Sequence, residues 1–332
     1  MAHRSKPSGK RRRKSRPPQR VTSFVPLDGR AEIRLVLGDC IEGFACLDAK
    51  SVDAVVTSPP YNAGKDYRSY DDSVPRDEYL RWTGEWARAV TRVLSDRGSF
   101  FLNVGGRPRD LWVAFDVLSV FRGLLTLQNV IHWVKSIAIE PQDLPGTRPA
   151  GRRRALPAGE PVTFGHYQPI GGRRYLNACH EYVFHFTHRG DVPLDRLAVG
   201  VPYRDKSNVT RWKGAAKDVH CRGNTWFIPY QTIQSRDKER PHPATFPVKL
   251  PEMCLRLHGL SRIDLAMDPF LGLGSTAVAC ANLDVPFVGF EIDEEYVGES
   301  CRRVAEALRT RDSAPAAPKT KNPPGTREGL LF

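Results

Sequence analysis

The sequence lacks the features that would assign it to several common classes of protein. No stretch approaches the ~18 consecutive apolar residues of a membrane span, and the basic N-terminus has no apolar segment of the signal-peptide kind. The seven cysteines include no C-x-x-C pair, which argues against both a zinc ribbon and a disulfide framework. We therefore expect a cytoplasmic protein with reduced cysteines and no membrane association.

Acidic residues are absent from the first 20 positions, which carry nine Lys and Arg. Residues 140–222 hold a second excess of +6, and the formal net charge of the whole chain is +13. The first segment and residues 311–332 have no apolar periodicity and are typical of disordered tails. The charge favours a polyanionic partner, and nucleic acid is the first candidate.

Between the tails, short apolar runs alternate with segments of helical periodicity. The expected strands are residues 33–37, 53–57, 99–104, 126–134, 180–186, 263–267 and 287–290. The expected helices are residues 79–94, 111–118, 247–258, 277–283 and 294–309. This alternation predicts a doubly wound, Rossmann-like α/β sheet. Residues 136–222 interrupt it with Pro, Gly and Arg, so they are expected to form an insertion.

A first group of candidate site residues follows the predicted strand that ends at Asp268. The chain continues as Pro269-Phe270-Leu271-Gly272-Leu273-Gly274-Ser275-Thr276 and then enters a predicted helix. Open α/β sheets bind ligands at the carboxyl ends of their strands, and glycines there allow a sharp turn and a close approach. The next strand ends at Glu291, an acid placed to bind ribose hydroxyls. An acid at position 268 suits a cofactor with an ammonium group better than a pyrophosphate.

A second group, Thr57-Ser58-Pro59-Pro60-Tyr61-Asn62, also follows a predicted strand. The two prolines make the turn rigid and supply no N–H donor, so its carbonyls are free to accept hydrogen bonds. A carbonyl and a hydroxyl that converge there would hold an exocyclic amino group, and Tyr61 offers a ring to an unstacked base. A proline turn that merely ends a strand is the structural alternative.

These two groups resemble the motifs of β-class DNA amino-methyltransferases. Ser58-Pro59-Pro60-Tyr61 resembles their catalytic motif, in which Ser, Asn or Asp precedes Pro-Pro and an aromatic residue. The run from Asp268 to Thr276 resembles their S-adenosylmethionine motif. The catalytic motif precedes the basic insertion and the cofactor motif follows it, which is the permuted order of that class. Leu37-Gly38-Asp39 and His242-Pro243-Ala244-Thr245-Phe246-Pro247 are similar to further segments of the family.

The resemblance covers roughly residues 33–135 and 223–309 and implies S-adenosyl-L-methionine as the cofactor. Its implied contacts are Asp39, Phe246, Asp268, Pro269, Phe270, Gly272, Gly274, Ser275, Thr276 and Glu291. Among these, Glu291 would hold the ribose and Asp39 the adenine amino group. The implied catalytic residues are Ser58, Pro59, Pro60 and Tyr61.

By the same resemblance, Ser58 and the Pro59 carbonyl accept hydrogen bonds from the target amino group, while Tyr61 stacks on the flipped base. The amino nitrogen then attacks the sulfonium methyl directly, and in-line geometry supplies most of the acceleration. No cysteine lies in the Pro-Cys turn expected of a cytosine-C5 enzyme. Cys40 and Cys280 are expected to be small buried hydrophobes.

Serine at the first motif position is more typical of N4-cytosine enzymes than of N6-adenine enzymes. The expected activity is therefore that of a site-specific cytosine-N4 DNA methyltransferase acting on double-stranded DNA, typically in a restriction–modification system. Because some adenine enzymes carry Ser there, N6-adenine methylation stays open. An inactive DNA-binding protein on the same fold is the alternative from another class, and the intact motifs argue against it. The basic insertion disfavours methylation of a protein amide.

The basic insertion is expected to recognise the target sequence through phosphate or guanine contacts. The candidate DNA-binding residues are Arg148, Arg152, Arg153, Arg154, Arg173, Arg174, Arg211, Lys213 and Lys217. The predicted divisions are a basic tail over 1–30, a catalytic half over 31–135, the insertion over 136–222, a cofactor half over 223–310 and a tail over 311–332.

No metal is expected, because His180, His185 and His188 lack cysteine or carboxylate partners at ligand spacing. The expected partners are double-stranded DNA and a cognate restriction endonuclease that acts on the same site. The sequence is compatible with a monomer or a dimer.

Overall fold

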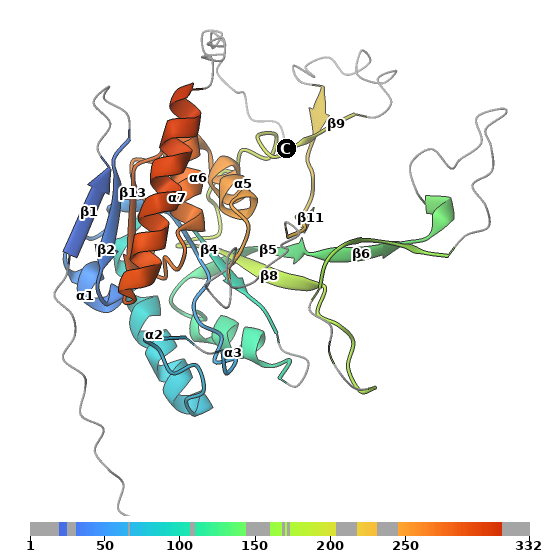
Figure 1. Ribbon diagram of the computed structural model, residues 1–332, viewed down its shortest axis with the longest axis horizontal. Coiled ribbons are helices and arrows are strands. Elements are labelled where there is room, and N and C mark those ends of the chain that lie inside the picture. The colour runs from blue at the N-terminus through green and yellow to red at the C-terminus, as the bar shows by residue number, and fades with distance from the viewer. Residues whose placement is uncertain are drawn as a thin grey trace, which may run out of the picture.

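A nine-stranded sheet runs through the described part of the molecule (Figure 1). The structure is a computed structural model that describes residues 20–24, 31–65, 67–106, 110–143, 160–167, 170, 173–203, 218–230 and 245–313. From one edge to the other, the strands are β1 (Arg20–Phe24), β2 (Ile33–Leu37), β13 (Phe287–Glu291), β12 (Ala266–Asp268), β3 (Val52–Thr57), β4 (Leu94–Val104), β8 (His180–Thr187), β5 (Thr126–Val134) and β11 (Thr225–Phe227). The five strands from β2 to β4 are parallel, whereas β8 is antiparallel to both β4 and β5.

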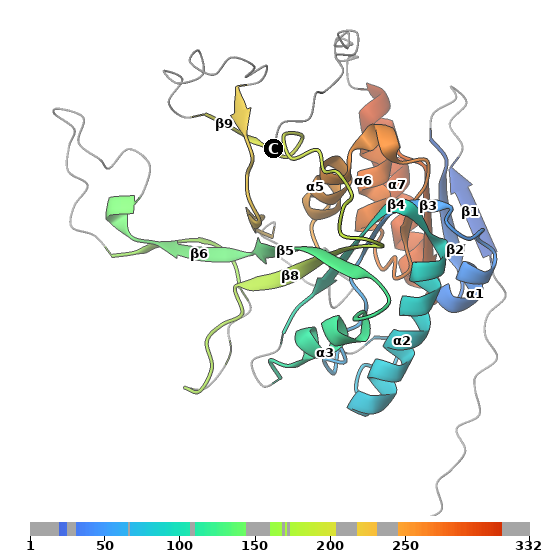
Figure 2. The same cartoon turned by 180° about the vertical axis from the view of Figure 1, so that it is seen from behind.

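Helices cover both faces of the sheet (Figures 1 and 2). On one face lie α5 (Lys249–His258), α6 (Ser275–Leu283) and α7 (Glu294–Ser313), and on the other lie α1 (Cys40–Ala45), α2 (Arg76–Val93) and α3 (Val113–Val120). The described residues also form two short 3-10 helices, η1 (Pro141–Asp143) and η3 (Leu260–Arg262). Among the described residues, no helix is long and apolar enough to cross a membrane.

The two helical layers explain why the central strands are apolar without alternation. Ala54 and Val56 of β3 pack toward α5 and α6, whereas Val55 packs toward α2, and all three are at most 3% exposed. A strand of a parallel sheet that is covered on both faces is expected to have this pattern. In α2, Tyr79, Trp86 and Val90 recur at helical spacing and form the face buried against the sheet.

Two short strand pairs lie outside the main sheet. Strand β6 (Ser136–Ile139) pairs with β7 (Val162–Gly165), and β9 (Val201–Pro202) pairs with β10 (Val219–His220). Figure 1 shows β6 continuing from β5 away from the helical layers. All four strands belong to the predicted insertion, so at least part of that region is built of short hairpin-like pairs.

The predicted doubly wound α/β fold is confirmed. The strands predicted over residues 33–37 and 126–134 have those bounds, and the other predicted elements occur with ends shifted by up to five residues. Two boundaries differ from the prediction at the termini of the fold. Strand β1 lies inside the predicted basic tail 1–30 and pairs antiparallel with β2, while α7 continues to Ser313, beyond the predicted boundary at 310.

The predicted division at residues 136 and 222 does not match the sheet. Strand β8 belongs to the predicted insertion, yet it lies between β4 and β5 and bonds to both. The main sheet therefore incorporates a strand from the insertion, because the antiparallel β8 satisfies the backbone groups along both neighbouring edges.

Candidate active site

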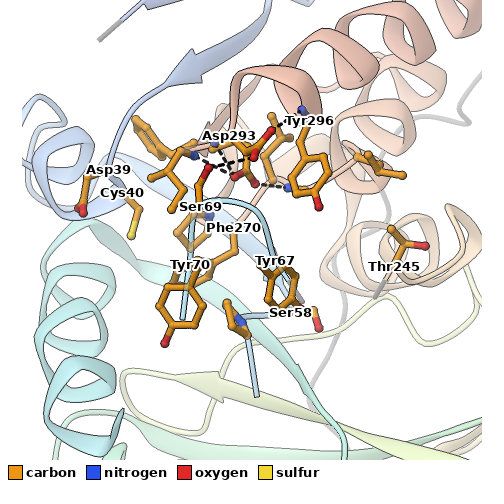
Figure 3. Close-up of a pocket in the computed structure, with 18 of the residues that line it drawn as sticks. Asp39, Cys40, Ser58, Tyr67, Ser69, Tyr70, Thr245, Phe270, Asp293 and Tyr296 are labelled. Atoms are coloured by element: carbon orange, nitrogen blue, oxygen red, sulfur yellow. Dashed lines mark hydrogen bonds between the residues drawn. The ribbon is translucent and has the colours of Figure 1, made fainter. Parts of the chain in front are cut away.

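A pocket of about 950 Å³, including the solvent space at its mouth, opens at the carboxyl ends of β2, β13, β12 and β3 (Figure 3). This is the edge at which open α/β sheets bind ligands. Of the predicted site residues, those on the pocket wall are Asp39, Ser58, Pro60, Phe246, Pro269, Phe270, Gly272, Ser275 and Glu291. The predicted residues that are not on the wall are Pro59, Tyr61, Asp268, Gly274 and Thr276. The structure thus brings the two motifs to one pocket, although more than 200 residues separate them in the chain.

Asp268 lies behind the pocket wall, where it joins three elements. Its Oδ1 accepts hydrogen bonds from Thr57 Oγ1 at 2.6 Å and from Phe270 N at 3.0 Å, and its Oδ2 accepts one from Thr276 Oγ1 at 2.8 Å. Burial raises the pKa of Asp268 to about 6, although these hydrogen bonds oppose the shift. The carboxylate therefore connects the ends of β3 and β12 to the first turn of α6. The predicted direct contact between this acid and a cofactor ammonium stays a prediction.

Glu291, at the end of β13, lies on the wall and is held by backbone amides. Gly272 N donates to its Oε2 at 2.9 Å, and the amides of Ile292 and Asp293 donate to its Oε1 at 2.9 and 3.0 Å. Burial raises the pKa of Glu291 to about 7, because the three amides compensate only part of the desolvation. The side chain is thereby fixed in one orientation beside the glycine turn.

The turn between β12 and α6 requires its second glycine. Gly274 has φ 72°, and a Cβ at this position would lie 2.9 Å from Ser300 Oγ. The same Ser300 hydroxyl donates to the Gly272 carbonyl at 2.8 Å. Any larger residue at position 274 would displace α7 from this turn and so distort the pocket wall.

Asp39 and Phe246 reach the pocket from elements on either side. Asp39 is the N-cap of α1, and its Oδ1 accepts a hydrogen bond from Ile41 N at 2.8 Å. Phe246 is 9% exposed, and its carbonyl accepts a hydrogen bond from Ser275 Oγ at 2.8 Å. Residues 242–244 of the same predicted segment lie outside the described residues.

A segment between β3 and α2 also lines the pocket, and the sequence analysis did not assign it a role. Its lining residues are Tyr67, Ser69 and Tyr70, shown in Figure 3 beside Phe270. Ser69 Oγ donates to Asp293 Oδ2 at 2.9 Å, while Asp293 Oδ1 accepts from two amides in the first turn of α7. This hydrogen bond links the segment after the catalytic motif to the cofactor half of the fold.

The predicted catalytic turn is held from inside by hydroxyl and amide groups. Ser58 Oγ and Tyr61 Oη are hydrogen-bonded at 2.7 Å, and Asn103 Nδ2 donates to Tyr61 Oη, also at 2.7 Å. The carbonyl of Pro60 accepts a hydrogen bond from Tyr79 Oη at 2.8 Å. Ser58 is therefore on the pocket wall with its hydroxyl connected to a polar network beneath it.

That network ends in a carboxylate that the sequence analysis did not identify. Glu181 Oε2 accepts hydrogen bonds from Asn103 Nδ2 at 2.7 Å and from Tyr61 Oη at 3.1 Å, while Lys135 Nζ donates to its Oε1 at 2.9 Å. Burial by itself would raise the pKa of Glu181, but Lys135 and the hydrogen bonds outweigh it, so the pKa lies below its ordinary value. Burial, followed by the charge of Glu181, raises the pKa of Tyr61.

Only two of the predicted DNA contacts are described by the structure. Arg173 and Arg174 are solvent-exposed. The others, Arg148, Arg152, Arg153, Arg154, Arg211, Lys213 and Lys217, lie outside the described residues.

The histidines of β8 and the cysteines have ordinary structural environments. His185 is buried, with Nε2 3.0 Å from Ser99 Oγ, and His188 Nε2 lies 3.0 Å from the Leu94 carbonyl. His180 packs against His132 with ring centroids 5.8 Å apart. Within the described ranges, no group of three or more metal-ligating side chains occurs. All seven cysteines are free, and burial raises the pKa of Cys254 and Cys280.

Comparison with known proteins identifies the family. The N6/N4 DNA methylase family model matches residues 52–301, which include both motifs and the strands that carry them. The chain belongs to this DNA methylase family. It is 25% identical over 281 residues to the type II methyltransferase M.HpaI of Haemophilus parainfluenzae, covering 84% of this chain and 76% of that protein. It is 27% identical over 292 residues to M.SmaI of Serratia marcescens, covering 82% and 90%.

The fold of this DNA methylase is also similar to a solved methyltransferase structure. The PvuII DNA methyltransferase, described as cytosine-N4-specific, aligns with a TM-score of 0.54 and 20% identity, covering 83% of this chain and 91% of that one. The cofactor of the DNA methylase is S-adenosyl-L-methionine, and the pocket suits it chemically. Asp39 and Glu291 supply acceptors for amino and hydroxyl groups, and Phe246, Phe270 and Phe290 supply apolar walls for a purine.

Proposed function

We propose that this DNA methylase transfers a methyl group to the N4 amino group of cytosine within a specific sequence of double-stranded DNA. The observation that carries the proposal is the position of Ser58. It lies on the wall of the same pocket as Asp39 and Glu291, and its hydroxyl is anchored from behind by Tyr61. Serine at this position, rather than Asp or Asn, is more typical of N4-cytosine enzymes and therefore favours cytosine as the target.

One part of the pocket would bind the cofactor, and the other part would bind the target base. Bound S-adenosyl-L-methionine supplies an electrophilic methyl group. Asp39 and Glu291 would bind its amino and hydroxyl groups, and the glycine turn at 272–274 gives the backbone a close approach. Ser58 and the Pro59 carbonyl would accept the hydrogens of the flipped base's amino group, which draws the nitrogen lone pair out of ring conjugation. The Pro60 carbonyl already accepts from Tyr79, so the Pro59 carbonyl is the one we assign.

Tyr61 would stack on the flipped base while its hydroxyl remains in the network beneath Ser58. A base in a duplex cannot reach a pocket at the end of a sheet, so the target nucleotide must leave the stack. Orientation of the amino nitrogen in line with the methyl group then accounts for most of the acceleration, and no covalent enzyme intermediate is required.

The partners follow from the same proposal. The basic insertion, including the exposed Arg173 and Arg174, would contact phosphates and bases around the target. The type II methyltransferases among the relatives favour a role beside a restriction endonuclease of the same specificity, in the cytoplasm where the cell's DNA lies. A monomer and a dimer are both compatible with this role.

The experiment is to incubate the full chain with labelled S-adenosyl-L-methionine and amplified, unmethylated plasmid DNA, and then to identify the modified nucleoside by mass spectrometry. We expect N4-methylcytosine. N6-methyladenine as the sole product would overturn the cytosine assignment and leave the methylase intact. The absence of labelled DNA would support the inactive DNA-binding alternative.

A further inference from the structure

Ser58 is connected to a charged pair by a continuous chain of hydrogen bonds. The chain passes from Ser58 Oγ to Tyr61 Oη at 2.7 Å, then to Glu181 Oε2 at 3.1 Å, and ends at the Lys135 ammonium, 2.9 Å from the other carboxylate oxygen. It therefore runs from the pocket wall at the end of β3 to residues on β8 and just after β5. The side chains of Lys135 and Glu181 are 12% and 14% exposed, so the pair is largely shielded but still reaches solvent.

The ion pair determines the direction in which these hydrogens point. Glu181 Oε2, 3.1 Å from Tyr61 Oη, and the Asn103 backbone carbonyl, 3.2 Å away, can only accept, so the single Tyr61 hydrogen points away from Ser58, and the charged carboxylate is the stronger of its two acceptors. The Tyr61 oxygen then accepts from Ser58 Oγ and from Asn103 Nδ2. Ser58 consequently donates its own hydrogen inward. One of its two lone pairs lies toward Asn103 Nδ2, 3.3 Å away, and the other is left to accept from an amino group in the pocket.

The contacts of the Asn103 amide are consistent with hydrogen bonds that run from Ser58 through Tyr61 to Glu181. Its Nδ2 has three acceptors within 3.3 Å, namely Glu181 Oε2, Tyr61 Oη and Ser58 Oγ. The amide nitrogen, not its oxygen, therefore belongs on the side of Glu181, as an ionised carboxylate requires.

We propose that Glu181, balanced by Lys135, orients Ser58 as a hydrogen-bond acceptor and receives, through Tyr61, the proton that leaves the target amino group. Glu181 does not touch the base and is in this sense a positioning residue. The inference rests on the proposed role of Ser58, and it applies equally to a cytosine or an adenine amino group.

The proton transfer balances without any further reactant. The amino nitrogen forms a bond to the methyl carbon, and the carbon–sulfur bond breaks with its electron pair remaining on sulfur. The nitrogen then carries one hydrogen too many, and that proton passes to Ser58 Oγ as the Ser58 proton moves to Tyr61 and the Tyr61 proton moves to Glu181. A protonated exocyclic amine of a nucleobase is a strong acid, so a carboxylate with a lowered pKa is basic enough to accept its proton. Glu181 then returns the proton to water.

Packing fixes the position of the Glu181 carboxylate. A Cβ on Gly105, just beyond β4, would lie 2.9 Å from Glu181 Cγ and 3.0 Å from Cδ, so a glycine there leaves the room that the side chain needs. The charged or titratable groups that face Glu181 are Lys135, Tyr61 and the neighbouring His180. Of these, Lys135 is the group whose removal changes the charge without touching Ser58 or Tyr61.

The first test replaces the carboxylate with an amide in Glu181→Gln. Lys135 would hold the amide oxygen, so the amide nitrogen would donate to Tyr61 and reverse the chain. With enzyme in excess over amplified plasmid DNA, we expect the single-turnover rate of label transfer to fall by about 10²-fold or more, with cofactor and DNA affinities within twofold of the wild type. Glu181→Asp keeps the charge, and we expect it to recover part of the rate.

The second test measures the acid limb of the pH–rate profile, which is the decline in the methyl-transfer rate at low pH. Loss of the ammonium in Lys135→Met raises the pKa of Glu181, so the decline in rate on the acid side should begin at a higher pH than in the wild type. In Glu181→Gln this limb should be absent. As a matched control, Lys50→Met removes a lysine from an exposed ion pair with Asp96, and the profile should stay unchanged.

A spectroscopic measurement supplies a readout independent of activity. In enzyme labelled with ¹³C at the glutamate carboxyl carbons, the NMR signal missing from Glu181→Gln should titrate below the ordinary range and move upward in Lys135→Met. A third variant, Gly105→Ala, leaves all charges in place but displaces the carboxylate, and it should slow transfer without abolishing the acid limb.

The outcomes separate this inference from the proposed function. If Glu181→Gln transfers methyl at the wild-type rate with the same acid limb, the inference is wrong, whichever base is methylated. Should that variant fail to fold, an unmoved limb in Lys135→Met overturns it equally. A wild-type enzyme that labels no amino group in DNA contradicts the proposed function itself.

Discussion

At the cofactor side of the pocket, the buried carboxylates of Asp268 and Glu291 receive their hydrogen bonds from hydroxyls and backbone amides. At the catalytic side, Glu181 faces the ammonium of Lys135. The first pair has raised pKa values, about 6 and about 7, whereas the pKa of Glu181 is lowered. The same type of side chain is therefore held in two electrostatic states within one site.

The difference follows from what each carboxylate has to do. Asp268 holds elements in place, and Glu291 holds the glycine turn while facing the pocket; hydrogen bonds serve both purposes whether or not the group carries a full charge. Glu181 must stay ionised to polarise the chain beneath Ser58, which requires a compensating cation close by. Changes at the catalytic side should accordingly affect turnover, and changes at the cofactor side should affect stability and cofactor binding.

The largest effect is expected for Ser58→Ala. Loss of the acceptor on the pocket wall should reduce methyl transfer by about 10²- to 10³-fold, while cofactor affinity measured by calorimetry stays within twofold. Ser51→Ala, before the other end of β3, removes an exposed hydroxyl bonded to the Asp48 carbonyl and serves as the matched control. Loss of cofactor binding in Ser58→Ala would contradict the assignment of turnover to the catalytic side and of cofactor binding to the cofactor side.

Asp268→Asn should act on folding instead. The amide oxygen can still accept from Thr57 and Phe270 N, but its NH₂ group cannot accept from Thr276, whose hydroxyl is left with the longer bond to the Val56 carbonyl at 3.2 Å. We expect the free energy of unfolding to fall by about 1–3 kcal/mol in chemical denaturation. The exposed Asp264→Asn, from the other end of β12, should be neutral. Unchanged stability in Asp268→Asn would contradict the structural role assigned to this carboxylate.

The raised pKa of Glu291 gives a pH dependence of defined sign. Between its ordinary value of 4.5 and about 7, the folded protein keeps a proton that the unfolded chain has already released. The contribution of Glu291 to stability therefore falls as the pH rises through this window. In denaturation at a series of pH values, Glu291→Gln should lose less stability than the wild type over the same window. The exposed Glu306→Gln should follow the wild type.

The smallest expected effect concerns the link between the two sides. Ser69→Ala removes the hydrogen bond to Asp293 and should weaken cofactor binding by about 2- to 10-fold. Ser73→Ala lies in the same segment but bonds to Asp71 away from the pocket, so it should leave the affinity unchanged. Equal affinities in the two variants would show that the segment after the catalytic motif does not support the cofactor side.

The sequence predicted that the two motifs lie at the same edge of the sheet, because both follow apolar strands. Parallel strands in one sheet bring their carboxyl ends to one edge, so Ser58 and Glu291 meet at one pocket without knowledge of the residues between them. Which way a side chain points at that edge is a matter of packing. Asp268 lies behind the wall because Thr57 and Thr276 converge on it, and sequence spacing carries no signal of that convergence.

Glu181 and Lys135 could not be identified from the sequence, for a different reason. They lie at the start of β8 and just after β5, and Glu181 reaches Tyr61 only because β8 is placed between β4 and β5. That placement is a long-range choice of strand neighbour, and it has no local signature. Strand β1 was missed because a five-residue edge strand that is largely exposed has too weak an alternation to be distinguished from the basic tail before it.

The position of β12 and β13 has a consequence for how the site comes into existence. These two strands are made late in the chain, yet they lie between β2 and β3, which are made early. Until they arrive, the nascent protein consists of two separate pieces of sheet, each with an open inner edge that is prone to pair with other chains. Closure then depends on contacts between distant parts of the chain, which slows folding. The pocket is therefore complete only after β12 and β13 have been made and have taken their places between β2 and β3.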